Sequence, residues 1–314
     1  MITTPKAEKL DARLSRDLNK VRGSTRESKQ RFRVEFRASS FPICPRKYHI
    51  YRRLPENKRP FERKSIASDL ATLPGTAMHL VLQEWFGAQI TDHCYGNWEC
   101  PVCSTPERKV IKYFALGVQQ CDDCGRDMVY SEFSIKKAHR VPFTGHLDMV
   151  LWYREDDFAV ILDYKSSTQK KIGELRSTGA YPKNYLQVNA YANAINLGEQ
   201  ELGELKKIDK VALMYVDRGE STANQSVYQY PVSVKVYHET IALIASAKRS
   251  VKDMVLPRGL CRSIDDEDAK WCPVKTLCFS PLLETLLSDT IQPLDTSVRE
   301  RIQENRLSTT KPKD

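Results

Sequence analysis

One segment, residues 143–167, limits the possible folds more than any other part of this chain. Its sequence, FTGHLDMVLWYREDDFAVILDYKSS, places two apolar runs on either side of a short polar stretch at residues 154–157, a pattern typical of a β-hairpin. Centring the turn on that stretch sets Asp148 directly opposite Asp163. Directly opposed residues share one face of the hairpin, with Cβ atoms about 4.5–5.5 Å apart. The sequence therefore predicts a pair of neighbouring carboxylates.

The two-residue period of a strand adds Lys165 to the face that carries Asp163 and turns Leu162 and Tyr164 into the opposite layer. Two opposed acids destabilise a strand pair unless a cation lies between them. Two carboxylates and an amine suit hydrolysis of a phosphodiester, with Mg²⁺ or Mn²⁺ polarising the phosphate and lowering the pKa of a bound water. The alternative is an exposed hairpin end with ordinary surface charges.

Further elements follow from hydrophobic spacing. Helices are expected at residues 74–90, 184–197 and 233–254, and strands at 128–136 and 211–217. The first helix carries His79 and, five residues later, Glu84, for which a solvated position is expected. The second carries Gln187 and Tyr191 on one face. Glu132, on the strand before the hairpin, is a weaker candidate for a further acid.

Nine cysteines in a chain whose first residues lack a signal-peptide pattern favour metal binding over disulfides, and a cytoplasmic location is expected. Two C-x2-C pairs separated by 17 residues predict a structural Zn²⁺ on a zinc ribbon. The expected ligands are Cys100, Cys103, Cys121 and Cys124, and the neighbouring Cys94 either replaces one of them or is free.

Charge is distributed unevenly along the chain. Residues 1–64 hold 19 Lys and Arg against 7 Asp and Glu, a net charge of +12, so the remainder carries −3 of the total of +9. This asymmetry favours a polyanionic partner such as nucleic acid, although a solvated basic tail is an equal alternative. Aromatic residues interleave with the basic ones, which is typical of single-strand binding, unless these rings pack in the core. They are Phe32, Phe36, Phe41, Tyr48, Tyr51 and Phe61.

The order G-H-L-D, strand, D-Y-K resembles the PD-(D/E)xK nuclease superfamily, specifically its RecB-type exonuclease branch. This resemblance implies an α/β, restriction-endonuclease-like core with a mixed central sheet. It implies that Asp148, Asp163 and His79 bind the catalytic metal together with the Tyr164 carbonyl. It further implies that Lys165 handles the water and that the helix pair of Gln187 and Tyr191 orients groups in the active site.

FPICPRKYHIY at residues 41–51, together with C-x10-C-x5-C near the C-terminus, resembles the iron–sulfur subgroup of these nucleases, which includes AddB subunits and CRISPR adaptation nucleases. The resemblance implies a [4Fe–4S] cluster held by Cys44, Cys261, Cys272 and Cys278. The usual first C-terminal pair is C-x2-C, whereas ten residues separate this one. A zinc ion in the same set and scattered free thiols are the alternatives.

These observations predict a basic arm at residues 1–38, a nuclease core at 39–90 and 128–283, a zinc-ribbon insertion at 91–127 and a polar tail at 284–314. The expected activity is metal-dependent cleavage of DNA, exonucleolytic and directed at single strands or ends, in recombination, repair or replication. No membrane partner is expected; a helicase, recombinase or integrase partner and a homo-oligomer stay open. The alternatives are a non-catalytic DNA-binding or assembly subunit and a structure-specific or RNA-directed nuclease within a larger complex.

Overall fold

A computed structural model describes residues 25–31, 36–55, 61–200, 202–218, 225–266, 269, 272–283 and 287. The chain divides into two compact units. The first, which we call the sheet unit, contains residues 35–42 and 63–241. The second, the terminal unit, contains residues 43–62 and 242–314. Among the described residues, none of the helices is long and apolar enough to cross a membrane.

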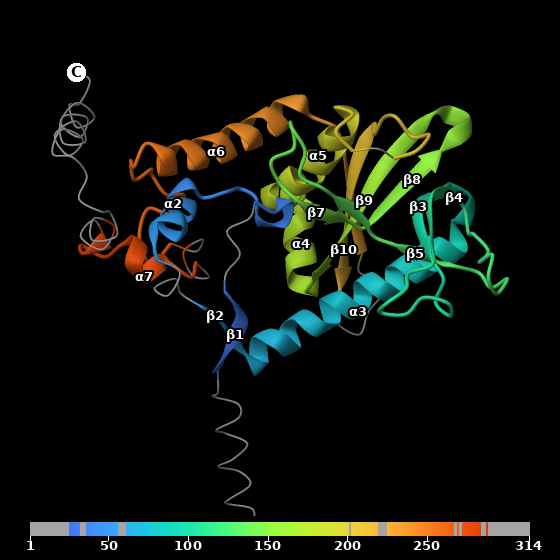
Figure 1. Ribbon diagram of the computed structural model, residues 1–314, viewed down its shortest axis with the longest axis horizontal. Helices are drawn as coiled ribbons and strands as arrows, with labels where there is room; N and C mark the ends of the chain where they lie inside the picture. Colours follow the sequence, from blue (N-terminus) through green and yellow to red (C-terminus); the bar gives the residue numbers. More distant parts are fainter. Residues whose placement is uncertain are drawn as a thin grey trace, which may run out of the picture. The chain divides into compact units, whose positions relative to one another are not determined.

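The sheet unit is built on a seven-stranded mixed sheet (Figure 1). Strand β9 pairs in parallel with β10, and the other neighbouring strands that pair in this sheet are antiparallel. The expected α/β architecture with a mixed central sheet is therefore confirmed. In spatial order the strands are β11 (Gln225–Pro231), β10 (Lys210–Asp217), β9 (Phe158–Ser167), β8 (Met149–Tyr153), β3 (Cys94–Glu99) and β4 (Ile111–Leu116), and β5 (Val129–Ser131) also pairs with β3.

The predicted hairpin forms with the expected register. Met149 lies opposite Leu162, and Tyr153 lies opposite Phe158. The turn is a short 3-10 segment closed by Asp157, whose φ of 47° lies in the left-handed region that Asp tolerates better than most residues. Extending the same register by one residue beyond β8 sets Asp148 opposite Asp163.

Helices cover both faces of the sheet. Helix α3 (Ile66–Gln89) packs Met78, Leu82 and Phe86 against the buried face that carries Leu162 and Tyr164. Helices α4 (Gln169–Thr178) and α5 (Pro182–Asn196) contact β10. Because successive side chains of β9 alternate, Asp163 points to the α5 side, where Gln187 donates to it.

Several elements differ from the sequence expectation. Helix α3 begins eight residues before Pro74, so the proline lies inside the helix and not in its first turn. Residues 91–127, expected as an insertion, contribute β3 and β4 to the central sheet within the same compact unit. In the predicted basic arm, β1 (Thr25–Arg31) pairs with β2 (Phe61–Ser65), while residues 1–24 lie outside the described part. Of the predicted polar tail, only Leu287 is described.

The terminal unit contains α2 (Pro45–Arg53), α7 (Lys275–Cys278) and the C-terminal part of α6 (Val234–Lys252). Its apolar cluster joins Ile50, Tyr51 and Leu54 of the α2 region to Val274 and Leu283. Cys44 caps α2, because its sulfur accepts the backbone N–H of Lys47 and Pro45 stands at the first helical position. The residues around the first and last cysteines are thus packed together.

Candidate active site

Asp148 stands at a break between two strands. Strand β7 (Gly145–Leu147) pairs with β6 (Phe133–Ile135), whereas β8, which begins one residue after Asp148, pairs with β9. Asp148 is only 5% exposed, and its Oδ2 accepts the backbone N–H of Tyr164 at 2.7 Å. This hydrogen bond fixes the carboxylate beside the strand that carries Asp163.

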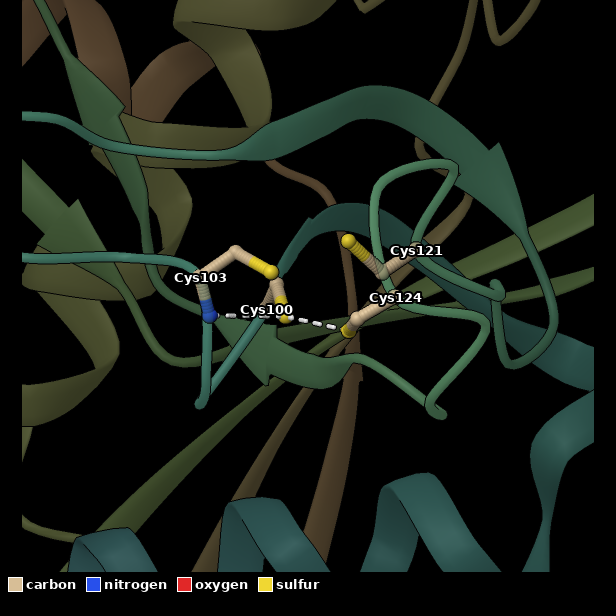
Figure 2. A group of neighbouring side chains, drawn as sticks. All are labelled: Cys100, Cys103, Cys121 and Cys124. Atoms are coloured by element: carbon tan, nitrogen blue, oxygen red, sulfur yellow. Dashed lines mark hydrogen bonds between the residues drawn. The ribbon is translucent and has the colours of Figure 1, made fainter.

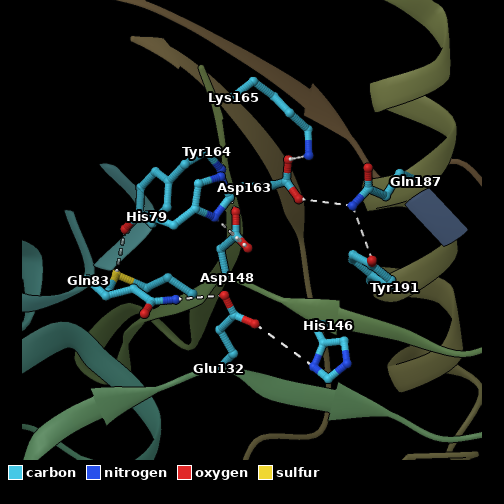
Figure 3. Close-up of polar contacts among 11 residues, drawn as sticks. His79, Gln83, Glu132, His146, Asp148, Asp163, Tyr164, Lys165, Gln187 and Tyr191 are labelled. Carbon is cyan, nitrogen blue, oxygen red and sulfur yellow. Dashed lines mark hydrogen bonds and ion pairs between the residues drawn. The ribbon is translucent and has the colours of Figure 1, made fainter. Parts of the chain in front are cut away.

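Asp163 lies in a polar group supplied by its own strand and by α5 (Figure 3). Its side chain is 1% exposed, and its Oδ2 lies 2.5 Å from Nζ of Lys165. Gln187 donates from Nε2 to Oδ1 of Asp163 at 3.2 Å and to the hydroxyl of Tyr191 at 3.1 Å. The predicted helix pair therefore contacts the predicted acid directly.

His79 reaches the site from α3. Its Nδ1 lies 3.4 Å from Oδ1 of Asp148, and its ring meets the ring of Tyr164 edge-on with centroids 5.9 Å apart. Gln83, one turn further along the same helix, donates to Oε1 of Glu132 at 3.1 Å. Glu132 lies between β5 and β6, and its Oε2 is 3.9 Å from Nδ1 of His146.

The charges of the acids and bases stabilise one another. Burial raises the pKa of Asp163 to about 7, and the neighbouring Asp148 adds to this shift while Lys165 opposes it. Burial lowers the pKa of Lys165, but the two aspartates outweigh it, so the pKa of Lys165 is raised overall. The hydrogen bond to Asp148 raises the pKa of His79. The aspartates thus stabilise positive charge on Lys165 and His79.

The ligand atoms that lie closest together are not the set expected from the sequence. Among the described residues, His79, Glu132 and Asp148 offer ligand atoms within 4.8 Å of one another, and Asp163 does not join this group. Hard oxygen ligands and an imidazole nitrogen fit a divalent cation such as Mg²⁺ or Mn²⁺. Glu84, the weaker candidate on α3, is exposed and lies outside the group. For Tyr164, the structure places the N–H on Asp148, and a role for its carbonyl stays a prediction.

The four cysteines of the two C-x2-C pairs converge at the end of the β3–β4 hairpin, as Figure 2 shows. Their sulfurs lie within 4.8 Å of one another, and the Sγ atoms of Cys100 and Cys124 are 3.7 Å apart. The backbone N–H groups of Cys103 and Val102 lower the pKa of Cys100 to about 7, which favours the thiolate that binds metal. Cys121 begins the turn that closes with Gly125 at a φ of 68°, a left-handed conformation that glycine adopts without strain.

Cys94 does not belong to this cluster. It is fully buried on β3, and its sulfur donates to the carbonyl of Phe86 at 3.5 Å and lies 3.8 Å from the sulfur of Met149. Burial raises the pKa of Cys94 to about 12, so this thiol stays protonated. It packs as an apolar side chain in the core.

The four terminal cysteines lie in one compact unit, but the described residues do not bring their sulfurs within 4.8 Å of one another as a group. Cys278 is close enough to Cys44 and Cys272 for their charges to raise its pKa, after the larger effect of burial. Arg46 donates from Nη2 to the carbonyl of Cys278 at 3.1 Å. The arrangement draws residues from both ends of the chain together without forming a compact four-sulfur site.

Three of the six aromatic residues proposed for single-strand binding are buried and unavailable to bases. Phe36, Phe41 and Tyr51 are buried, and Phe41 packs edge-on against Phe143 in the sheet unit. The guanidinium of Arg52 lies 5.6 Å from the ring centre of the half-buried Tyr48. Phe32 and the side chain of Phe61 lie outside the described residues. Core packing therefore explains Phe36, Phe41 and Tyr51.

Sequence reasoning gave little weight to Glu132 and did not consider Gln83 or His146. The available signal for Gln83 is its spacing, because it follows His79 by four residues and so shares its helix face. No comparable local pattern marks Glu132, which reaches the site only through the pairing of β6 with β7.

Comparison with known proteins agrees with this geometry. A model of the PD-(D/E)XK nuclease superfamily matches residues 37–279. No curated protein matches the chain significantly. Among solved structures, the crystal structure of an alkaline exonuclease (LHK-Exo) from Laribacter hongkongensis is similar with a TM-score of 0.26 and 11% sequence identity, over 39% of this chain and 61% of that one. Since the family model spans most of the chain and includes every residue of the described site, this protein belongs to the PD-(D/E)XK nuclease superfamily.

Proposed function

We propose that this protein is a divalent-metal-dependent DNA nuclease of the RecB type that degrades single strands or DNA ends. The observation that carries the proposal is the buried polar group in which Asp148, Asp163, Lys165 and His79 lie together on one rigid sheet and its covering helix. Such a concentration of buried charge costs stability unless it serves binding or chemistry.

The residues present fit Mg²⁺ or Mn²⁺. In the proposal, Asp148, Asp163 and His79 hold the cation, with the Tyr164 carbonyl as a further ligand. The bound cation would polarise the scissile phosphate and lower the pKa of the attacking water. Lys165 is held cationic by the two aspartates, so we assign it to orienting that water and offsetting the negative charge that develops on the phosphate.

Gln187 and Tyr191 take positioning roles in this account. Gln187 is 7% exposed, and its Nε2 donates hydrogen bonds to Asp163 and to the hydroxyl of Tyr191. Gln187 therefore holds the carboxylate of Asp163 at a fixed angle. Tyr191 is 1% exposed, and burial raises its pKa, which keeps the phenol protonated. A protonated phenol both accepts from Gln187 and keeps a proton available for a hydrogen bond.

We assign the two cysteine sets to different metals. The closely spaced set of Cys100, Cys103, Cys121 and Cys124 suits a single tetrahedral Zn²⁺. The wider terminal set of Cys44, Cys261, Cys272 and Cys278 suits a [4Fe–4S] cluster, because each thiolate of such a cluster binds a different iron atom and the sulfurs stay farther apart than around one ion. Anaerobic purification with elemental analysis tests both, with about four iron and one zinc per chain expected.

The activity is tested with the full chain on labelled linear single-stranded, linear duplex and circular single-stranded DNA, each with EDTA, Mg²⁺ or Mn²⁺. We expect degradation of linear single strands that requires the metal, and no cleavage of circles. Cleavage of circles would replace the exonuclease assignment with an endonuclease. Retarded mobility of DNA without any product in either metal would contradict the nuclease and favour a non-catalytic binding subunit.

A further inference from the structure

We propose that Glu132 is a further metal ligand that joins His79 and Asp148 in binding the divalent cation, and that Asp163, whose oxygens have protein partners, contributes less to binding it. The inference rests on the proposed function and deepens it, since it adds Glu132 to the side chains that hold the cation. It comes from the side-chain geometry alone: three different parts of the chain supply the ligands.

The distances suit one ion. The three ligand atoms lie within 4.8 Å of one another. Metal–ligand bonds of about 2.0–2.2 Å place atoms of one octahedral shell roughly 3–4.4 Å apart, so small side-chain shifts suffice. Figure 3 shows the three side chains converging from α3, from the segment between β5 and β6, and from the β7–β8 junction.

The ligands are held in place by neighbouring groups. Gln83 is 5% exposed and donates to Oε1 of Glu132 at 3.1 Å, and Oε2 of Glu132 lies 3.9 Å from Nδ1 of His146. Tyr164 donates its N–H to Oδ2 of Asp148, and Oδ1 faces His79. Hydrogen-bonded partners of this kind orient metal ligands and increase their affinity. Helix α3 thus supplies both a ligand, His79, and the residue that orients another.

Asp163 is engaged differently. Both of its oxygens have protein partners, with Lys165 at 2.5 Å from Oδ2 and Gln187 at 3.2 Å from Oδ1. The ammonium of Lys165 therefore compensates its charge, whereas among the described residues the ion-pair partners of Asp148 and Glu132 are imidazole rings, at 3.4 Å and 3.9 Å. The side chain of Glu132 is 37% exposed, which leaves room for water and a phosphate oxygen on the open side of the cation.

The test measures Mn²⁺ binding by electron paramagnetic resonance on the full chain, independently of cleavage. Glu132→Gln keeps the carbonyl oxygen that accepts from Gln83 but removes the charge. We expect its Mn²⁺ affinity to fall at least tenfold, since losing even an outer partner of a metal ligand costs roughly 10–100-fold. Glu84→Gln, an exposed glutamate on α3, is the matched control and should bind Mn²⁺ as the native chain does. Asp163→Asn should lose less affinity than Glu132→Gln.

A second readout identifies the position of the ion. Mn²⁺ bound to the native chain should show nitrogen coupling in spin-echo modulation spectra, and His79→Ala should abolish this coupling. Native-like Mn²⁺ affinity in Glu132→Gln, or a larger loss in Asp163→Asn, would overturn the inference. The proposed function fails separately: a native chain that needs Glu132 for Mn²⁺ but cuts no DNA refutes the nuclease and keeps the metal site.

Discussion

Oδ2 of Asp148 lies 2.7 Å from the backbone nitrogen of Tyr164, and this hydrogen bond joins two strand segments that have already separated. Asp148 belongs to the junction where the chain passes from the smaller β6–β7 sheet into the central sheet, whereas Tyr164 follows Asp163 on β9. The acid therefore sits at an opening beside the sheet, where a helix side chain such as His79 reaches it from one side and Asp163 faces α5 on the other.

The close approach of the Tyr191 ring to Gly145 leads to the first prediction. A Cβ placed on Gly145 would lie 2.4 Å from Cε1 of Tyr191, so Gly145→Ala must displace the ring and, with it, the hydrogen bond from Gln187. Overpacking of this kind costs about 1–3 kcal/mol of unfolding free energy. We expect this loss in denaturant titrations, together with at least a tenfold lower cleavage rate, the equivalent of about 1.4 kcal/mol.

Gly173→Ala is the matched control for that substitution. Gly173 lies on α4, and a Cβ there would meet no atom within 4 Å. Alanine should leave cleavage unchanged and raise stability by up to about 1 kcal/mol through its higher helix propensity. If Gly145→Ala behaved like Gly173→Ala in both measurements, Tyr191 would not be fixed as described.

His49 makes the terminal unit sensitive to acid. Burial, with a smaller effect of Arg53, lowers the pKa of His49 from 6.5 to about 4, and its Nδ1 lies 3.3 Å from the hydroxyl of Ser250. Between these values the unfolded chain binds a proton that the folded chain does not, so stability is retained above pH 6.5 and falls as the pH drops toward 4. The loss between pH 7 and pH 5 should be about 1–2 kcal/mol.

Urea titrations at pH 7 and pH 5 measure this loss in the native chain and in His49→Asn. The asparagine does not titrate, so its curve should change less between the two pH values. An equal change in both proteins would assign the acid sensitivity to other groups.

If the four clustered cysteines hold zinc as proposed, its loss should affect the active site as well as the cysteine cluster. Cys100 and Cys121 belong to the same buried apolar cluster as Tyr130, Met149 and Tyr164, and the backbone N–H of Tyr164 donates to Asp148. We expect Cys100→Ser to lose the bound zinc, to unfold at a lower temperature and to cleave DNA more slowly. Elemental analysis, thermal melts and cleavage rates measure the three effects.

Cys94→Ala is the control for the cysteine substitution, because Cys94 lies in the same apolar cluster but its thiol contacts Phe86 and Met149 rather than the other cysteines. It should keep a full complement of zinc. Zinc content reduced equally in both variants would mean that the four clustered sulfurs do not define the site.

The hairpin and its register were predictable because both are local properties of the sequence. The turn stretch at 154–157 is short and polar, and the apolar runs on either side of it define the two strands, so centring the turn fixes which residues lie opposite one another. Strands β3 and β4 were not predicted, because Cys, Gly and Pro residues recur through residues 94–127 and interrupt the strand pattern. Asn97, for example, is a polar residue that does not indicate a strand, yet it pairs with Ser131 of β5.

The candidate site likewise contains some residues that the local sequence predicted and others that only the folded chain brings together. Asp163 and Lys165 lie on β9, and Asp148 directly precedes β8, so the register of this hairpin was enough to predict that the three lie near one another. Glu132 was undervalued because its approach to His79 and Asp148 depends on three segments far apart in the sequence. Its neighbour Gln83 has an ordinary polar position on a helix, and only the folded chain shows that it faces Glu132.

The most direct test of the central claim is the Mg²⁺-dependent cleavage rate of Asp163→Asn and Lys165→Ala on linear single-stranded DNA, with Asp156→Asn as the matched control. Asp156 lies exposed in the hairpin turn, away from the site. We predict that both site variants lose cleavage while binding DNA and retaining zinc, and that Asp156→Asn cleaves like the native chain. Cleavage at the native rate by either site variant would contradict the account.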